Sequence, residues 1–203
     1  MRGVAQRPAT EVGAAAVASD AVLLAHAQHD RAAFASLYDR YFEPIFRFCF
    51  YRLGDWQEAE DAASDIFANA IAGLGRVRAD DREDGFRCWL FTIARHVIAN
   101  RHRDRARRRT GSLDSAAELH DLTQSPEEAA LVADDHRYLH ALLGQLKPDQ
   151  RDLLELRLAG LNDAQIARVL GRSHDAVRKE QSRTIRTLRG LVDDQMKGGR
   201  ADA

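Results

Sequence analysis

The segment NDAQIARVLGRSHDAVRKEQSRTIRTLRGL, residues Asn162–Leu191, decides the fold of the C-terminal part of this chain. Asn162 and Gln165 form an N-cap pair that predicts the start of a short helix. Gly171 supplies a left-handed turn residue, and Ser173 caps the next helix. Two helices joined by so short a turn predict a helix-turn-helix.

The second helix of this motif has one apolar side and one basic side. Val177, Thr184, Ile185 and Leu188 are expected to face inward. The residues expected to contact duplex DNA from the other side are Arg172, Ser173, His174, Arg178, Lys179, Ser182, Arg183 and Arg186. Arg178 and Arg183 can pair with guanine edges, whereas Arg172 and Arg186 suit phosphates equally well. The alternative is that these cations only solvate a surface helix.

An acidic stretch separates this motif from the rest of the chain. Between residues 114 and 135 there are seven Asp or Glu and no Lys or Arg. The stretch predicts a flexible acidic linker over 110–126, followed by a second domain over 127–194 and a tail over 195–203. Within that domain a leucine-rich helix is expected from about Pro148 to Gly160.

Residues 20–109 predict a first domain, a bundle of helices that follows an N-terminal tail over 1–19. One helix begins after Ser19, a second carries apolar residues from Phe34 to Tyr41, and Pro44 is expected to open a third that Gly54 ends.

A further helix begins at Asp55. Its expected apolar stripe consists of Ala59, Ala62, Ala63, Ile66, Phe67 and Ala70, and its polar stripe consists of Glu58, Asp61, Asp65 and Asn69. The fold class predicted for the whole chain is therefore all-α, with two small helical domains.

The last helix of the first domain begins near Phe86 and combines aromatic with cationic residues. Stacking faces beside cations are what unpaired bases and their phosphates require. The residues expected to bind a single strand are Phe86, Arg87, Trp89, Arg95, His96, Asn100, Arg101 and Arg103. Trp89 is also spaced as a core residue, which remains the alternative for it.

Composition excludes several classes of protein. Hydrophobic residues at 45% and charged residues at 30% indicate a folded chain, and the formal net charge of −1 excludes a uniformly basic one. Cys49 and Cys88 lie far apart without nearby ligand residues, so we expect reduced core thiols, no metal and no cofactor. No stretch is long and apolar enough for membrane insertion, and a cytoplasmic location is expected.

Taken together, these segments resemble the extracytoplasmic-function (ECF) sigma factors, from about Ala33 to Leu191. The resemblance is carried by GDWQEAED at 54–61, by FRCWLFTIAR at 86–95, and by the helix-turn-helix with the leucine-rich helix before it. Ser64 and His96 depart from it, since the family often has Gln and Asn at these positions.

This resemblance implies roles and partners. The first domain would bind RNA polymerase core, at the clamp of the β′ subunit, through Glu58, Asp61, Ser64 and Asp65. It would also melt the minus-ten element of promoter DNA, while the second domain would read the minus-thirty-five element and meet the flap of the β subunit. The acidic linker would lie in the nucleic-acid path of polymerase, and an anti-sigma factor is a hypothesised partner.

Three other readings of the sequence stay open at this point. A conventional helix-turn-helix regulator would explain the second domain but leaves the first without a role. An α-helical enzyme acting on nucleic acid would need metal-binding carboxylates or an activated nucleophile, and the eight histidines are scattered without such a pattern. In an adaptor protein the basic helices would serve protein contacts instead.

Overall fold

The computed structural model describes residues 18–77, 84–109 and 138–198, and every regular element in these parts is helical. The elements of the first module are α2 (Asp20–His29), η1 (Arg31–Ala33), α3 (Phe34–Leu53), α4 (Trp56–Gly73), η2 (Leu74–Arg76) and α5 (Gly85–Arg109). The second module contains helical residues 138–144, α7 (Pro148–Leu158), α8 (Asp163–Leu170) and α9 (His174–Gly198). The all-α prediction is confirmed; the predicted linker at 110–126 lies outside the described residues.

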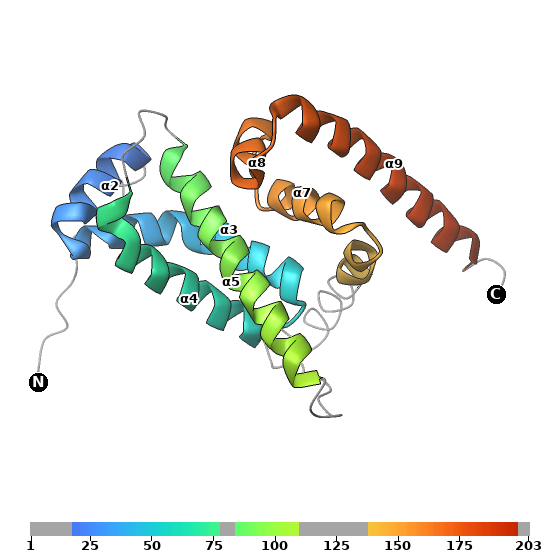
Figure 1. Ribbon diagram of the computed structural model, residues 1–203, viewed down its shortest axis with the longest axis horizontal. Coiled ribbons are helices and arrows are strands. Elements are labelled where there is room, and N and C mark those ends of the chain that lie inside the picture. Colours follow the sequence, from blue (N-terminus) through green and yellow to red (C-terminus); the bar gives the residue numbers. More distant parts are fainter. Residues whose placement is uncertain (1–17, 78–83, 110–137, 199–203) are drawn as a thin grey trace, which may run out of the picture.

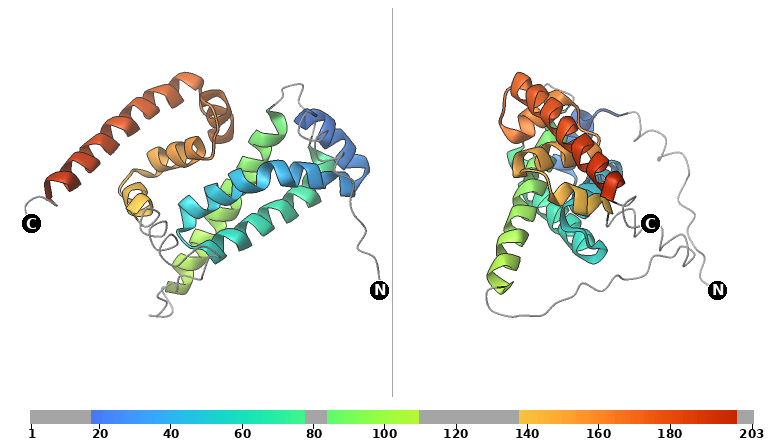
Figure 2. Two further views of the ribbon diagram at one scale, coloured as in Figure 1. Left: turned by 180° about the vertical axis from the view of Figure 1, so that it is seen from behind. Right: turned by 90° about the vertical axis from the view of Figure 1, so that its right-hand side faces the viewer.

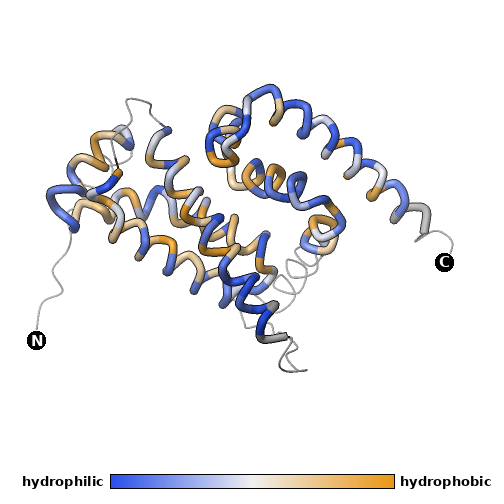
Figure 3. Tube along the Cα trace, in the orientation of Figure 1, coloured by the Kyte–Doolittle hydropathy of each residue, from blue (hydrophilic) through white to orange (hydrophobic). Residues whose placement is uncertain are grey.

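The two modules lie against each other (Figure 1), with α5 beside α8 and α3 beside α7. The left view of Figure 2 shows that α9 runs along the outer edge of the second module, away from the first. In Figure 3 the C-terminal end of α5 is strongly hydrophilic, and α9 is hydrophilic over most of its length.

Helix α3 corrects one prediction, because Pro44 does not open a helix but lies inside a continuous one. Proline removes one backbone donor from an α-helix. The helix continues because apolar residues on both sides of Pro44 pack into the core, among them Tyr41, Ile45 and Phe48. Gly54 then ends it with a left-handed φ of 73°, as expected.

The helix ends follow local rules that were readable in the sequence. Asp55 accepts a hydrogen bond from the backbone N–H of Glu58 at 2.7 Å and so caps α4.

The six apolar residues of the expected α4 stripe are all buried, and four of them are alanines that let α4 pack closely on α3 and α5. Helix α9 continues to Gly198, so it extends four residues into the segment predicted as a tail from residue 195.

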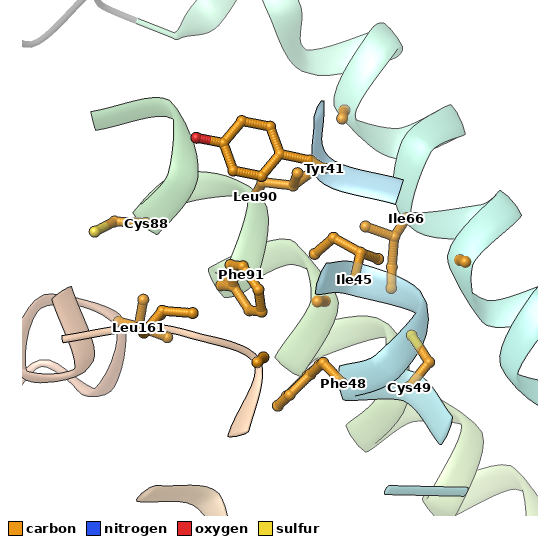
Figure 4. Close-up of a cluster of buried hydrophobic side chains, with 14 of the residues drawn as sticks. Tyr41, Ile45, Phe48, Cys49, Ile66, Cys88, Leu90, Phe91 and Leu161 are labelled. Atoms are coloured by element: carbon orange, nitrogen blue, oxygen red, sulfur yellow. The ribbon is translucent and has the colours of Figure 1, made fainter. Parts of the chain in front are cut away.

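One continuous apolar cluster runs through both modules. Figure 4 shows Leu161 of the second module in the same cluster as Phe48 and Phe91 of the first. Leu161 is 1% exposed and Phe91 is fully buried. Apolar area removed from water stabilises a contact by roughly 25 cal/mol per Å². The placement of the two modules is therefore supported by core packing and not only by surface charges.

Candidate nucleic-acid and polymerase-binding surfaces

The helix-turn-helix is built as the sequence predicted. Asn162 and Gln165 exchange reciprocal side-chain to backbone hydrogen bonds of 2.9 Å, which complete a capping box at the start of α8. Gly171 ends α8 with a φ of 64°, and Ser173 accepts a hydrogen bond from the Ala176 N–H at 3.2 Å. The turn between α8 and α9 therefore begins at a left-handed glycine C-cap and ends at a serine N-cap.

Helix α9 and the turn before it present a hydrophilic, cation-rich surface. All eight residues predicted to contact duplex DNA are exposed. Arg183 lies 3.4 Å from Glu180 on the same helix, and Arg172 pairs with Asp149 of α7 at 2.7 Å. Ile185 corrects the predicted inward face, because it is 43% exposed while Val177 and Thr184 are buried.

A hollow of about 340 Å³ opens between the end of α4 and the middle of α5. We call it the α4–α5 hollow; its lining residues are Asn69, Gly73, Arg76, Trp89, Ile93, His96, Val97 and Asn100. Trp89 is half-buried and its ring lies close over Gly73, where an added Cβ would stand 3.0 Å from it. A side chain larger than glycine at position 73 would therefore displace the indole. Trp89 is a wall of the hollow and is not fully buried.

The residues predicted to bind a single strand divide between two sides of α5. Trp89, His96 and Asn100 line the hollow. Arg87 and Arg95 lie on the other side of α5, where they contact the second module. Helical spacing explains the division, because residues three and four apart share a face.

The remaining predicted strand-binding residues have other surroundings. Phe86 is a correction: it is 2% exposed and packs against the rings of Phe34 and Tyr41, so it offers no face to a base. Arg101 pairs with Asp65 at 2.5 Å, and Arg103 donates to the side-chain oxygen of Asn100.

One polar residue of the hollow, Asn69, was not predicted as strand-binding. Asn69 was recognised only as part of the polar stripe of α4. The signal that could have found it is that stripe itself, since α4 turns Asn69 toward the same solvent-facing groove as the polar side of α5. Arg76, which also lines the hollow, lies at the end of the short η2 helix.

The acidic stripe of α4 is partly neutralised by the basic end of α5. Glu58 pairs with Arg105 at 3.1 Å, and Asp65 pairs with Arg101. Asp61 and Ser64 are exposed, and Asp61 accepts only a long bond from Gln57, at 3.4 Å, among the hydrogen bonds found in the described residues. Of the predicted polymerase-binding residues, these two are the most available to a partner.

A cluster of charged residues joins the two modules, and sequence reasoning missed it. Arg52 of α3 lies 2.6 Å from both Asp152 and Glu155 of α7, and Arg95 of α5 lies 3.0 Å from Asp152. Glu155 is fully buried and also accepts from Arg151 at 2.6 Å. Burial raises the pKa of Glu155, and the guanidinium groups of Arg52 and Arg151 oppose that increase.

Neither cysteine is placed for reactivity. Burial raises the pKa of Cys49 to about 12 and that of Cys88 to about 11, so both remain thiols at neutral pH. In the described parts of the chain, no three His, Cys, Asp or Glu side chains converge on a point where a metal could bind. Among the same residues, no helix is both long and apolar enough to cross a membrane.

These surfaces define a two-module helical protein whose second module carries an exposed, cation-rich recognition helix. The family profile for sigma-70 region 2 matches residues 37–108, and the profile for sigma-70 region 4 matches residues 136–188. The first match contains the α4–α5 hollow, and the second contains the helix-turn-helix. Together they span more than half of the chain.

Among proteins with these two sigma-70 regions, curated relatives of the chain are ECF sigma factors. The chain is 32% identical over 163 residues to the ECF RNA polymerase sigma factor BldN of Streptomyces coelicolor, covering 80% of this chain and 61% of that relative. It is 30% identical over 178 residues to the ECF RNA polymerase sigma factor SigD of Mycobacterium tuberculosis, covering 85% of this chain and 83% of SigD. The chain belongs to the ECF sigma factors of the sigma-70 family.

Solved structures agree on the fold. CnrH, solved in complex with the cytosolic domain of CnrY, matches with a TM-score of 0.66 at 24% identity and covers 86% of this chain and 97% of its own. The sigma factor RpoE of Bartonella quintana, solved with the anti-sigma factor NepR, matches with a TM-score of 0.55 at 18% identity and covers 77% of this chain and 96% of its own.

Proposed function

We propose that this chain binds RNA polymerase core and directs it to promoters, and that it catalyses no reaction itself. The first module captures unpaired bases of the minus-ten element, and the second reads the minus-thirty-five element as duplex. The observation that carries the proposal is the presence, in one chain of this family, of an aromatic hollow suited to single strands and an exposed helix suited to a major groove. Such a protein works in the cytoplasm, where polymerase and promoter DNA are found.

The α4–α5 hollow has the size and chemistry for an extruded base. Its volume lies within the roughly 300 to 1,000 Å³ of typical small-molecule pockets. The Trp89 indole offers a stacking face, and stacking on an aromatic side chain contributes about 1–3 kcal/mol per base. The side-chain amides of Asn69 and Asn100 can donate to and accept from base edges, and Arg76 adds a cation for a phosphate or a guanine.

The proposed contact with polymerase lies on α4. Asp61 and Ser64 are exposed side by side with the partly neutralised Glu58 and Asp65, which suits a basic partner surface. By analogy with the family, this surface meets the clamp of the β′ subunit, and the second module meets the flap of the β subunit. An anti-sigma partner is proposed because one solved neighbour, the sigma factor RpoE, was crystallised with the anti-sigma factor NepR.

The role of the hollow can be tested with two promoter templates, one fully paired and one already opened over the minus-ten element. We expect Trp89→Ala to reduce initiation on the paired template about tenfold or more, because losing about 1–3 kcal/mol of stacking weakens strand capture. The pre-opened template should restore much of the activity. Asn100→Ala, an exposed position, should act in the same direction without disturbing the core.

The matched control is Trp56→Ala, which removes the other tryptophan of the chain. Trp56 packs on Phe46 and Phe50 at the opposite end of α4 and does not line the hollow. Its loss should affect the two templates equally. If Trp89→Ala and Trp56→Ala had the same effect on both templates, the hollow would not be the strand-binding site.

A further inference from the structure

Helix α9 is held in the second module by few apolar contacts. Among the α9 residues whose side chains the structure describes, Val177 is the one buried apolar side chain, at 1% exposed. Leu188 is half-buried, and Ile185 is 43% exposed. Because apolar burial is non-directional, so small a contact leaves the rotation of the helix about its own axis weakly constrained. Directional polar contacts must supply that constraint.

Arg157, in the last turn of α7, makes such contacts. Its guanidinium donates to the carbonyl oxygen of Leu161 at 3.2 Å and to the side-chain oxygen of Gln181 on α9 at 3.3 Å. It also pairs with Asp163, the first residue of α8. A guanidinium presents several N–H donors in a rigid planar fork, so one side chain can bind several acceptors at once. Arg157 therefore joins α7 to both helices of the helix-turn-helix.

Gln181 lies on the inner side of α9, although exposed residues follow it directly. Gln181 is half-buried, whereas Ser182 and Arg183 are exposed. At about 100° per residue around an α-helix, Gln181 lies about 40° from the buried Val177, and Arg183 lies about 200° from Gln181. Holding Gln181 in place therefore fixes the direction in which the outer side chains of α9 project.

That direction matters more for reading bases than for binding phosphates. An arginine pairs with a guanine edge through two parallel hydrogen bonds, which require the planar fork to be aligned with the base. Side chains in binding sites have to be held to within about 0.5 Å and about 10–20° of the productive geometry. Phosphate contacts carry no sequence information. A rotated α9 should therefore lose sequence preference before it loses affinity for arbitrary duplex DNA.

We propose that Arg157 is the positioning residue of the recognition helix. By binding Gln181 it orients Arg178 and Arg183, and it thereby sets the sequence preference of the second module. Neither Arg157 nor Gln181 contacts DNA in this arrangement, since Arg157 acts through Gln181 and Gln181 faces inward. The inference rests on the proposed function, because it requires that α9 reads duplex DNA.

The test uses the full chain and two duplex probes, one selected by the unmodified protein from a library of randomised duplexes and one of random sequence. Arg157→Met keeps an unbranched side chain but removes every donor. It should lower the ratio of affinities for the selected and the random duplex about fivefold or more, the value of one weak base contact. Thermal unfolding monitored by circular dichroism verifies that the variant remains folded.

The matched control is Arg189→Met, which removes one positive charge from an exposed position of α9. Loss of a charge weakens binding to every duplex through the same electrostatic attraction. Arg189→Met should therefore leave the affinity ratio unchanged, even where both affinities fall. An equal change of the ratio in Arg189→Met and Arg157→Met would overturn the positioning role, because charge alone would then explain it.

A second variant, Gln181→Leu, removes the acceptor on α9 and leaves the pair of Arg157 with Asp163 in place. It should lower the affinity ratio as Arg157→Met does, and the double variant should be no lower than either single variant, because both remove one contact. If Arg157→Met does not fold, Gln181→Leu still decides the question.

Three outcomes would contradict these expectations in different ways. An unchanged ratio in Gln181→Leu would overturn the inference. Losses that multiply in the double variant would also overturn it, since Gln181 would then act independently of Arg157. An unmodified protein that enriches no duplex from the library would instead contradict the proposed function, and the inference with it.

Discussion

At the scale of single residues, the arginines of α9 differ in what they are expected to contact. Arg178→Ala or Arg183→Ala should weaken promoter-duplex binding by about 1–3 kcal/mol and relax the sequence preference, since each removes a forked donor for a base edge. Arg186→Ala should weaken binding to every duplex sequence by the same amount, because a phosphate contact carries no sequence information. Fluorescence anisotropy with promoter and random duplexes distinguishes base contacts from phosphate contacts. Equal losses on both duplexes for Arg178→Ala would exclude base reading.

A substitution at Gly171 measures the energetic cost of the left-handed backbone conformation in the turn before α9. Its φ of 64° is left-handed, and no atom outside its neighbours lies within 4 Å of an added Cβ. Gly171→Ala should therefore destabilise the protein by about 1–2 kcal/mol through backbone strain alone. Gly190→Ala, inside α9 and equally open, should stabilise it by about 1 kcal/mol. Denaturant unfolding measures both changes; a stabilising Gly171→Ala would contradict the assigned turn.

At the scale of helices, α4 is expected to carry the polymerase contact. Asp61→Arg should weaken core binding about tenfold or more, because it reverses an exposed charge on the proposed interface. Asp39→Arg, an equally exposed reversal on α3, is the control and should leave core affinity unchanged. Duplex binding by α9 should be unaffected in both. If Asp61→Arg bound core normally, the contact would have to be sought outside the acidic stripe.

Helix ends and buried stripes could be predicted from the sequence because local chemistry determines them. The capping box at Asn162, the left-handed Gly54 and Gly171, and the alanine-rich face of α4 all follow short-range rules. Pro44 was misplaced because a local rule for proline was outweighed by core packing on both sides of it. Phe86 was misassigned because an aromatic ring near arginines suits a core as well as a strand-binding face.

At the scale of the whole molecule, the contact between modules should depend on pH. Burial and the nearby Arg151 and Arg105 lower the pKa of His140, whose ring also lies against the end of α3 at Gly54. The unfolded chain, with an ordinary histidine pKa of about 6.5, then binds this proton more tightly than the folded protein does. The stability that neutral His140 contributes is therefore fully present above the unfolded-state pKa of about 6.5. It is lost as the pH falls from there toward the lower pKa of His140 in the folded protein.

This dependence can be measured as the fall in Tm between about pH 7.5 and pH 5.5. His140→Gln, which stays neutral, should show a smaller fall than the unmodified protein. His102, whose pKa burial and neighbouring arginines also lower, should retain part of the dependence in that variant. An unchanged pH profile in His140→Gln would show that His140 is not a source of the effect.

The relative placement of the modules could not be predicted from the sequence. Arg52 lies about a hundred residues before Asp152 and Glu155 in the sequence, and no periodic pattern relates charges on different helices. The same reason explains Arg87 and Arg95, which were expected to bind a strand but contact α7 and α8 and the turn between them. Pairing across modules depends on tertiary packing, which local propensity does not specify.

The most direct measurement is in vitro transcription from a genomic DNA library with purified polymerase core, with and without this protein. Discrete new start sites that share an upstream motif are expected, because both modules contribute to choosing the promoter. Specific duplex binding without any new initiation would contradict a sigma role. It would leave a conventional helix-turn-helix regulator as the better description of the chain.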